Sequence, residues 1–187
     1  MIFKRIFDLV FAIMGLFLLS WALILLWIIA SIDTRSNGFF IQKRIGQYGK
    51  PFVIFKLKTI GPRTCHISAI GAFLRKTKLD ECPQLWNVLI GDMSFVGPRP
   101  DVAGYYDELQ GEEKKILELK PGITSLASVK YRNEENLLAN QENPLKYNDE
   151  VIFPDKVKMN MEYYNNHSII EDIKIIFKTC LFFSFFF

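Results

Sequence analysis

The sequence contains few of the residues that cross-link a small domain or bind a metal. Its three cysteines, Cys65, Cys82 and Cys180, are far apart and form no CxxC pair. This pattern argues against a disulfide framework and fits a reducing compartment. Histidine occurs only at His66 and His167. Because no second cysteine–histidine pair accompanies Cys65 and His66, a zinc site is not expected.

A large excess of charge of one sign is also absent. The net charge is +3 over 187 residues, so composition gives no reason to expect a nucleic-acid partner. No internal repeat or low-complexity linker divides the chain, and its length fits one folded core. Hydrophobic residues, in contrast, make up 50% of the sequence, and phenylalanine alone occurs 17 times. We therefore expect some apolar surface to contact lipid.

The longest apolar segment, residues 9–32, reads LVFAIMGLFLLSWALILLWIIASI and contains no charged residue. At ~1.5 Å per residue in a helix, it is long enough to cross a hydrocarbon core of about 30 Å, and it is too long for a signal-peptide core. Basic residues lie on both sides of it, Lys4 and Arg5 before and Arg35 and Lys43 after. Because basic flanks stay cytoplasmic, two topologies remain open: a single crossing, or a re-entrant helix with both ends on the same side.

The rest of the chain alternates short strand-like and helix-like patterns, which predicts an α+β fold. Two short strands, 39–41 and 52–55, are joined by a glycine-containing turn and predict a hairpin. We expect helices over residues 70–76, 84–90, 101–119, 156–164 and 169–187, and a turn at 120–124 before a strand at 125–131. The final helix fits either a helix in the membrane interface or one packed on the core. The chain thus divides into a membrane-embedded helix, residues 1–34, and a mostly helical domain, residues 35–187.

The stretch KLDECPQLWNVLIGDMSFVGPRP, residues 78–100, places two carboxylates, Asp80 and Glu81, just before the proline that opens a helix. One interpretation is structural: Asp80 caps the helix and Glu81 complements its dipole. The other is chemical, because many cations lie near the pair in the sequence. They are Lys56 and Lys58 on a predicted strand, Arg75, Lys76 and Lys78 upstream, and Arg99 between two prolines.

Carboxylates and cations together suit phosphoryl transfer. Cations bind phosphate oxygens, and a carboxylate can attack phosphorus to form an acyl-phosphate intermediate. A divalent ion would neutralise phosphate charge and assist the leaving group. The two prolines beside Arg99 restrict its backbone, so its side chain is presented at little ordering cost.

This stretch resembles the central signature of the bacterial sugar transferases, the monotopic polyprenyl-phosphate phosphoglycosyl transferases. Further parts of the family pattern resemble KRIFDLVFA, GFFIQKRIGQYGKPFVIFKLKTI, IGAFLRKTKLDE, KPGIT and MEYYNNHSIIEDIKIIFKT, in the same order along the chain. The resemblance therefore covers nearly the whole sequence. It implies transfer of a sugar 1-phosphate from a nucleotide sugar to a polyprenyl phosphate, with release of a nucleoside monophosphate. This would be the first membrane step of surface-glycan synthesis.

The resemblance also implies roles for individual residues. Asp80 would be the nucleophile that forms a covalent phosphosugar intermediate, and Glu81 would assist the metal or handle the acceptor's proton. Substrate and phosphate contacts would come from Lys56, Lys58, Arg75, Arg99 and Gln84. The implied cofactor is Mg²⁺, with Asp80 and Glu81 as candidate ligands.

The implied partners are a uridine nucleotide sugar, undecaprenyl phosphate and the membrane, with a homo-oligomer left open. The implied location is the bacterial inner membrane, with a re-entrant helix and with residues 35–187 as a catalytic domain on the cytosolic face. Two other functions compete with this one. They are a non-catalytic membrane scaffold and a metal-dependent phosphohydrolase that uses water as the acceptor.

The sequence departs from the family pattern at several places. Trp21 follows Ser20 where the family has a proline after the serine, so the usual cause of a break in the helix is missing. Lys58 stands where the family often has arginine, which loses bidentate geometry. Cys82 replaces a common leucine and is expected to be a packing residue. The KPGIT turn continues as SLASVKYRNEE, which leaves the sugar open.

Overall fold

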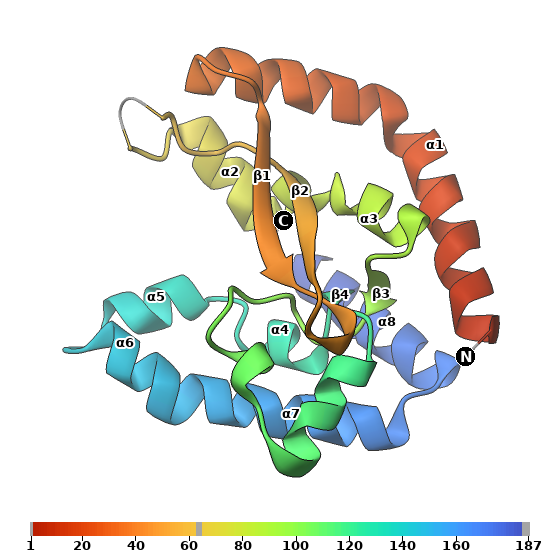
Figure 1. The fold of residues 1–187 in the computed structure, drawn as a ribbon. Helices are drawn as coiled ribbons and strands as arrows, with labels where there is room; N and C mark the ends of the chain where they lie inside the picture. The colour runs from red at the N-terminus through yellow and green to blue at the C-terminus, as the bar shows by residue number, and fades with distance from the viewer. Residues whose placement is uncertain (1, 63–64, 185–187) are drawn as a thin grey trace. The chain divides into compact units, whose positions relative to one another are not determined.

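The computed structural model describes residues 2–62 and 65–184 and shows the α+β fold that the sequence predicts (Figure 1). The chain forms two compact units. Unit 1 comprises the residues up to Arg44 and Pro51–Ser94, and unit 2 comprises Ile45–Lys50 and the residues from Phe95 onward. The acidic pair of the central stretch thus belongs to unit 1, and the GPRP segment belongs to unit 2.

Unit 1 contains a long helix, a hairpin and two short helices. Its elements are α1 (Ile2–Thr34), β1 (Phe39–Ile45, its last residue in unit 2), β2 (Pro51–Leu57), α2 (Ala69–Thr77), the 3₁₀ turn η2 (Leu79–Glu81) and α3 (Gln84–Ile90). β1 and β2 pair as the predicted hairpin, and α2 and α3 confirm two of the predicted helices. The core side chains of these elements, Ile54, Leu57, Leu74 and Val88, are almost completely buried.

Local chemistry fixes the ends of α2 and α3. The hydroxyl of Ser68 accepts a hydrogen bond from the N–H of Gly71 at 2.9 Å and caps the start of α2. Lys78 ends α2 with φ of 57°, and Gly91 ends α3 with φ of 98°. Glycine adopts this left-handed conformation readily, whereas for lysine it costs about 1 kcal/mol. The turn that leads into the acidic pair is therefore strained.

α1 is a continuous helix that bends near its middle (Figure 1). The hydroxyl of Ser20 donates to the carbonyl of Phe17 at 2.9 Å, and such side-chain bonds to the preceding turn favour bending. Near the start of α1, the guanidinium of Arg5 donates to the carbonyl oxygens of Val88 and Leu89, at 2.6 and 2.8 Å. The first part of α1 is thus joined to the end of α3.

Both ends of α1 contact the rest of unit 1, while the apolar stretch between the two ends is mostly exposed. Asp8 is 2% exposed and accepts a hydrogen bond from the hydroxyl of Ser94 at 3.1 Å. At the other end, Asp33 accepts from the hydroxyl of Ser68 at 2.6 Å, and Thr34 is buried. The most apolar 18-residue window of α1 has a mean hydropathy of 2.7 and is only 6% buried. By length and composition, α1 could cross a membrane.

Unit 2 is mostly helical and is built around two small apolar clusters. Its elements are η1 (Gln47–Gly49), β3 (Ser94–Val96, its first residue in unit 1), η3 (Tyr106–Glu108), η4 (Gly111–Glu118), β4 (Gly122–Thr124), α4 (Leu126–Lys130), α5 (Glu134–Ala139), α6 (Pro144–Tyr147), the π-helical turn η5 (Asn148–Ile152), α7 (Phe153–Asn166) and α8 (Ile169–Ser184). β3 pairs with β4. One cluster joins Val96, Leu119, Tyr163 and Ile175, and the other joins Tyr106, Ile116, Leu117 and Val157.

Three secondary-structure predictions for unit 2 are wrong, and the first two concern residues 101–119 and 125–131. The helix predicted over 101–119 is replaced by the 3₁₀ turns η3 and η4. Gly104 and Gly111 both adopt a positive φ there, which an α-helix does not contain. The strand predicted over 125–131 is the short helix α4, because the hydroxyl of Ser125 accepts from the N–H of Ser128 and caps a helix.

The strand β4 lies instead where the sequence predicted a turn. Its Gly122 is so close to the neighbouring strand end that a Cβ there would lie 2.2 Å from the backbone nitrogen of Gly97. Glycine is therefore needed at this position for the pairing of β3 with β4. Such a close backbone approach depends on a segment distant in sequence, so the local pattern could not predict it.

α8 agrees with both interpretations of the final helix. One face packs on the core, and the other face exposes apolar side chains that could lie in a membrane interface. Ile175 is fully buried in a core cluster, and the hydroxyl of Thr179 bonds that of Thr124 at 2.8 Å. The outer face leaves large apolar side chains exposed, namely Ile170, Ile173, Phe177 and Leu181. Residues 185–187 of the predicted helix lie outside the described residues.

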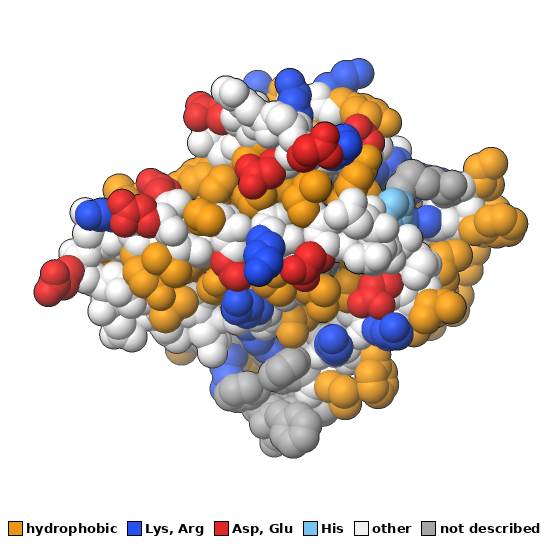
Figure 2. All heavy atoms as spheres, turned by 90° about the horizontal axis from the view of Figure 1, so that it is seen from below, with side chains coloured by type: hydrophobic (Ala, Val, Ile, Leu, Met, Phe, Trp, Pro, Cys, Tyr) orange, Lys and Arg blue, Asp and Glu red, His pale blue; other side chains and the backbone are white. Residues whose placement is uncertain are grey.

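Opposite charges are paired locally in unit 2. Lys130 binds Asp155 and Lys156 binds Glu134, each at 2.7 Å. Figure 2 shows acidic and basic side chains interspersed on one face of the molecule. A face of this kind is typical of a solvated protein surface.

Candidate active site

The acidic pair lies in the short turn η2, between α2 and α3. Lys78 reverses the chain after α2, and its carbonyl accepts from the N–H of Glu81 at 3.1 Å. This turn directs both carboxylates into unit 1, where Asp80 is 7% exposed and Glu81 is 6% exposed. Charged side chains are rarely buried to this extent unless they are paired.

The structural interpretation of Asp80 as a helix cap is wrong. The residue at the N-cap position of α3 is Pro83, and no side chain forms a capping hydrogen bond there. Asp80 Oδ1 is buried and has no hydrogen-bond partner among the described residues. A buried, unpaired carboxylate oxygen is costly. A buried carboxyl group with perturbed surroundings is common among reactive groups, and this makes Asp80 a candidate for one.

The surroundings of Asp80 change its acidity. Burial, and then the neighbouring charge of Glu81, raise the pKa of Asp80 from 3.8 to about 6, whereas Lys56, Lys78 and Arg75 lower it. The carboxylate is thus still ionised at neutral pH, but it is poorly solvated. An anion that has lost its water and faces several cations is suited to attack an electrophilic phosphorus atom.

Lys56 and Glu81 form an ion pair beside Asp80. The ammonium of Lys56, on β2, lies 2.9 Å from Oε1 of Glu81, and both side chains are largely buried. A buried pair of this kind needs good geometry to offset the loss of solvent. The two adjacent carboxylates are therefore not equivalent: Glu81 is bound by a lysine, whereas Oδ1 of Asp80 has no hydrogen-bond partner within residues 2–62 and 65–184.

The structure places the other predicted site residues of unit 1 as follows. Arg75 is in the last turn of α2, close enough to lower the pKa of Asp80. Gln84 opens α3 and is 3% exposed, and its amide makes no hydrogen bond to another described residue. Lys58 lies just after β2 and donates instead to the hydroxyl of Ser36 at 3.1 Å. Lys58 is thus bonded to the segment that follows α1.

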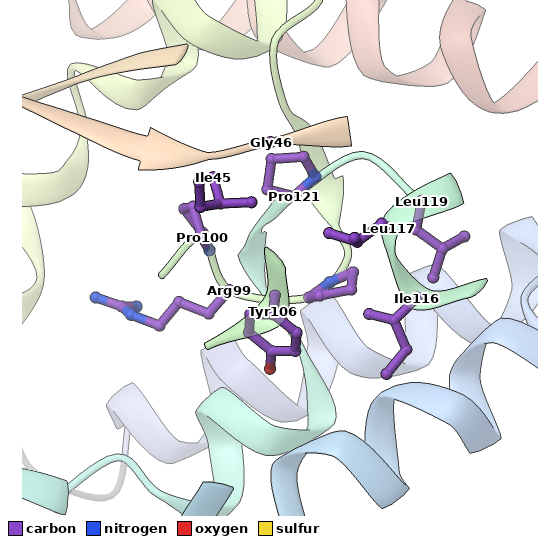
Figure 3. A pocket seen from close by; sticks show the side chains of 10 residues that line it. Ile45, Gly46, Arg99, Pro100, Tyr106, Ile116, Leu117, Leu119 and Pro121 are labelled. Carbon is purple, nitrogen blue, oxygen red and sulfur yellow. The ribbon is translucent and has the colours of Figure 1, made fainter. Parts of the chain in front are cut away.

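Arg99 belongs to unit 2 and is presented by a rigid backbone. Pro98 and Pro100 flank it, and the carbonyl of Pro98 accepts from the N–H of Gly122 at 2.9 Å. The segment lines a pocket of about 20 Å³, together with residues from the 45–46 turn and η4. Figure 3 shows the side chain of Arg99 extending away from Ile116, Leu117 and Leu119.

This pocket is not a binding site for a nucleotide sugar. A volume of about 20 Å³ is enough for a water molecule, whereas sites for drug-sized ligands have volumes of roughly 300–1,000 Å³. The pocket lining is mostly proline and aliphatic side chains. The pocket is therefore too small to hold a nucleotide sugar, and its lining includes both prolines that flank Arg99.

Lys78 and Cys82 are close to Asp80 in the sequence, and the structure gives each of them a different part in its surroundings. The sequence groups Lys78 with the upstream cations and does not single it out as a site residue, although its charge lowers the pKa of Asp80. The signal was its position two residues before Asp80. Cys82 is partly buried, and burial, followed by the charges of Asp80 and Glu81, raises the pKa of its thiol. A thiol that remains protonated is a poor nucleophile, which agrees with a packing role.

The acidic pair fits one kind of metal ion. Among residues 2–62 and 65–184, no group of three or more histidine, cysteine or acidic side chains could enclose a metal. Mg²⁺ often binds through one or two carboxylates and takes its remaining ligands from substrate phosphates and water. The unpaired oxygen of Asp80 and the carboxylate of Glu81 fit that arrangement.

Comparison with known proteins identifies relatives over almost the whole chain. The sequence matches the family profile described as "Bacterial sugar transferase" over residues 1–185. It is 32% identical to an uncharacterised sugar transferase, EpsL, of Bacillus subtilis, over 94% of this chain and 84% of that protein.

Two further relatives are longer proteins with more specific names. The chain is 33% identical to a UDP-glucose:undecaprenyl-phosphate glucose-1-phosphate transferase of Klebsiella pneumoniae and to an undecaprenyl-phosphate galactose phosphotransferase of Salmonella typhimurium. The matches cover 96% and 94% of this chain but only 39% of each of those proteins. The chain therefore spans well under half the length of these two relatives.

Proposed function

Because the chain belongs to the bacterial sugar transferase family, we propose that it transfers a sugar 1-phosphate from a nucleotide sugar to polyprenyl phosphate. The observation that carries this proposal is the buried carboxylate of Asp80, which has an unpaired oxygen and lies near Lys56, Lys78 and Arg75. The names of the longer relatives support undecaprenyl phosphate as the acceptor and a uridine diphosphate sugar as the donor.

In the first step, a carboxylate oxygen of Asp80 attacks the β-phosphorus of the nucleotide sugar. A bond forms between that oxygen and phosphorus, and the bond from the β-phosphorus to the bridging oxygen breaks. The bridging oxygen leaves with its electron pair as part of the nucleoside monophosphate. Cations stabilise the charge that develops on the phosphate oxygens. Lys56, Lys78 and Arg75 are the candidates for this role in unit 1. The phosphate-binding role of Arg99, in unit 2, stays a prediction from the family resemblance.

In the second step, a phosphate oxygen of the polyprenyl phosphate attacks the same phosphorus atom. The bond between Asp80 and phosphorus breaks, which restores the carboxylate and yields a polyprenyl diphosphate sugar. Glu81 accepts the acceptor's proton where the lipid phosphate is singly protonated. Mg²⁺, held by the carboxylates and by donor phosphates, would neutralise charge on the diphosphate when bound.

The exposed apolar surface of α1 indicates membrane association. We propose that α1 is re-entrant, because Arg5 and Asp8 near its start and Asp33 at its end all bond to unit 1. A straight helix of 33 residues would be about 50 Å long, which would separate the two ends by more than the bilayer core. The bend near the middle of α1 (Figure 1) would let the helix end on the side of the membrane where it begins, although α1 contains no proline.

Unit 1 also exposes apolar side chains close to the acidic pair. Phe73 on α2 and Trp86 on α3 are about half exposed, at 51% and 50%. Aromatic side chains in such positions favour the membrane–water interface. We therefore propose that Asp80 lies at the headgroup level, where a lipid phosphate meets a cytosolic nucleotide sugar, on the cytosolic face of the bacterial inner membrane.

The proposal is tested by release of nucleoside monophosphate from the purified protein in nanodiscs. Magnesium, undecaprenyl phosphate and a panel of nucleotide sugars are supplied, with Asp80→Asn beside the wild type. We expect release with one donor by the wild type and a loss of at least 1,000-fold in the variant. Retained turnover in Asp80→Asn would disprove the role of Asp80 as nucleophile.

A second readout separates transferase from phosphohydrolase activity. Incubation with donor alone should add the mass of a sugar phosphate to the peptide that contains Asp80, and later addition of lipid should remove it. Continuous release of nucleoside monophosphate without any lipid would favour a hydrolase. A scaffold would show no release with any donor, although it would have no reason to keep a buried, unpaired carboxylate.

A further inference from the structure

Asn87 lies in the middle of α3 and bonds to the edge of β2. Its side chain is completely buried. The amide nitrogen of Asn87 donates to the carbonyl of Val53 at 2.6 Å, and its amide oxygen accepts from the N–H of Phe55 at 3.3 Å. A carbonyl and an N–H two residues apart on one edge of a strand normally pair with a neighbouring strand. The amide of Asn87 takes the place of that third strand.

The bonds explain why an asparagine is found here. Asparagine has no advantage over apolar residues inside a helix, and a buried amide without partners is costly. At Asn87, both ends of the amide are bonded to β2. The side chain therefore fixes both the separation of β2 from α3 and the position of β2 along its own direction.

The next residue along β2 is Lys56, whose ammonium binds Glu81 at 2.9 Å. Successive side chains on a strand point to opposite faces, so a shift of one residue would turn Lys56 away from the acidic pair. Glu81 precedes α3, and Asn87 lies within it. α3 thus carries Asn87, which bonds to β2. It also directly follows the turn that carries Glu81, the carboxylate that Lys56 of β2 binds.

We propose that Asn87 is a positioning residue of the active site, which holds β2 at the register in which Lys56 binds Glu81 beside Asp80. Asn87 itself touches no substrate and acts through Lys56. The positioning of Lys56 stands on geometry alone, whereas its effect on turnover rests on the proposed function.

The first test measures the ion pair without any catalysis. Competitive acetylation of lysines at one pH, read by mass spectrometry, reports how reactive Lys56 is relative to the exposed Lys43 and Lys50 of the same molecule. Asn87→Leu removes both bonds with little change in volume. Glu81→Gln, which removes the ion pair of Lys56 with Glu81, gives the reactivity of a Lys56 that has lost this bond.

The matched control is Val88→Ala. Val88 is the next residue on α3, is also fully buried, and its side chain is apolar, so the substitution destabilises the same helix without removing a bond to β2. We expect Lys56 to become at least threefold more reactive in Asn87→Leu, as in Glu81→Gln, and to change by less than 1.5-fold in Val88→Ala. Unchanged reactivity in Asn87→Leu, or an equal rise in Val88→Ala, would overturn the proposal.

A measurement on the wild type covers the case in which Asn87→Leu does not fold. Backbone amide exchange at Phe55 should be slowed at least 100-fold relative to an unstructured peptide, because its N–H is bonded to Asn87. Exchange at the unprotected rate would overturn the proposal without the use of any variant.

The second test measures turnover and distinguishes positioning from general destabilisation. Lys56→Met and Asn87→Leu should each lower kcat/KM by roughly 10- to 100-fold, and the double variant should lose little more than the worse single variant. Multiplied losses would mean that Asn87 acts independently of Lys56, which contradicts the proposal. If the wild type is inactive with every donor, the proposed function fails, and the acetylation and exchange results still decide the position of Lys56.

Discussion

At the scale of single residues, the proposed active site depends on one buried carboxylate. Asp80 has an oxygen with no hydrogen-bond partner in the described part of the chain, while its neighbour Glu81 is bound by Lys56. In the proposed mechanism, this difference gives the two adjacent acids separate tasks: Glu81 is held in place, and Asp80 is available to react. A protein that keeps such a group sacrifices some stability for reactivity.

The first prediction concerns that loss of stability. The folded state binds the Asp80 proton more tightly than the unfolded state, since the pKa rises from 3.8 to about 6. The unfolded chain therefore loses this proton first as pH rises, and the free energy of unfolding falls between pH 4 and 6 and then stays low. The change from 3.8 to about 6 corresponds to about 3 kcal/mol.

Asp80→Asn removes this titration. We expect the variant to be more stable than the wild type by about 1–3 kcal/mol at pH 8 and to have nearly equal stability at pH 4. Thermal unfolding in detergent with EDTA present, repeated across this pH range, measures the difference. An Asp80→Asn variant that is less stable than the wild type at pH 8 would show that the carboxylate stabilises the fold.

At the scale of elements, α1 is the part whose role the sequence left most open. Charge and composition allowed either a crossing or a re-entrant helix. The contacts of Arg5 and Asp8 at one end, and of Asp33 at the other, attach both ends of α1 to the same unit. That unit cannot lie on both sides of a bilayer, so the contacts favour a re-entrant α1.

The second prediction follows from this attachment. In a background without the native cysteines, single cysteines at Ile2 and Lys43, both exposed, should react with a membrane-impermeant thiol reagent from the same side. In whole cells neither should react until the inner membrane is opened. A cysteine at Phe17, which is 80% exposed in the absence of lipid, should stay protected throughout. Labelling of Ile2 and Lys43 from opposite sides would establish a crossing.

Elements whose ends are set by neighbouring residues could be predicted from the sequence. The cap at Ser68 and the glycine at Gly91 bound α2 and α3, and the hairpin follows from its glycine turn. Residues 101–119 could not be predicted, because their Glu- and Lys-rich composition favours a helix. The burial of Tyr106 and Ile116 against α7 and the positive φ of Gly111 decide their actual structure.

The same limit applies within the site. The acidic pair and most of its cations could be predicted, because the family pattern and their clustering point to phosphate chemistry. The burial of Asp80 could not, because it depends on the packing of distant segments. The bonds of Asn87 could not either, because they join it to Val53 and Phe55, 34 and 32 residues away. Lys58 is the opposite case. Its charge and its position in the sequence predicted a phosphate-binding residue, but its ammonium donates a hydrogen bond to the hydroxyl of Ser36.

At the scale of the whole molecule, apolar surface rather than charge is the feature that indicates membrane association. The net charge is +3, and many surface charges are paired locally, as Lys130 is with Asp155. α1, in contrast, exposes many large apolar side chains along its length. Electrostatic attraction to anionic lipid is screened by salt, whereas the burial of apolar surface is not.

The third prediction is that washing does not remove the protein from membranes. Membranes from an expressing strain, treated with 1 M sodium chloride or with sodium carbonate at high pH, should retain more than 90% of the protein. Mild detergent should release it. Recovery of most of the protein in the salt wash would mean that the membrane association is peripheral and that α1 is covered in some other way.

The link between Arg5 and the end of α3 also sets an order of events during synthesis. Arg5 precedes Val88 and Leu89 by 83 and 84 residues, which a ribosome adds in about 4–17 seconds. Throughout that interval α1 exists without the helix to which it later bonds. In the proposed membrane arrangement, the nascent helix therefore enters lipid before its own domain has been made, and the remainder of unit 1 assembles on a helix that is already in the membrane.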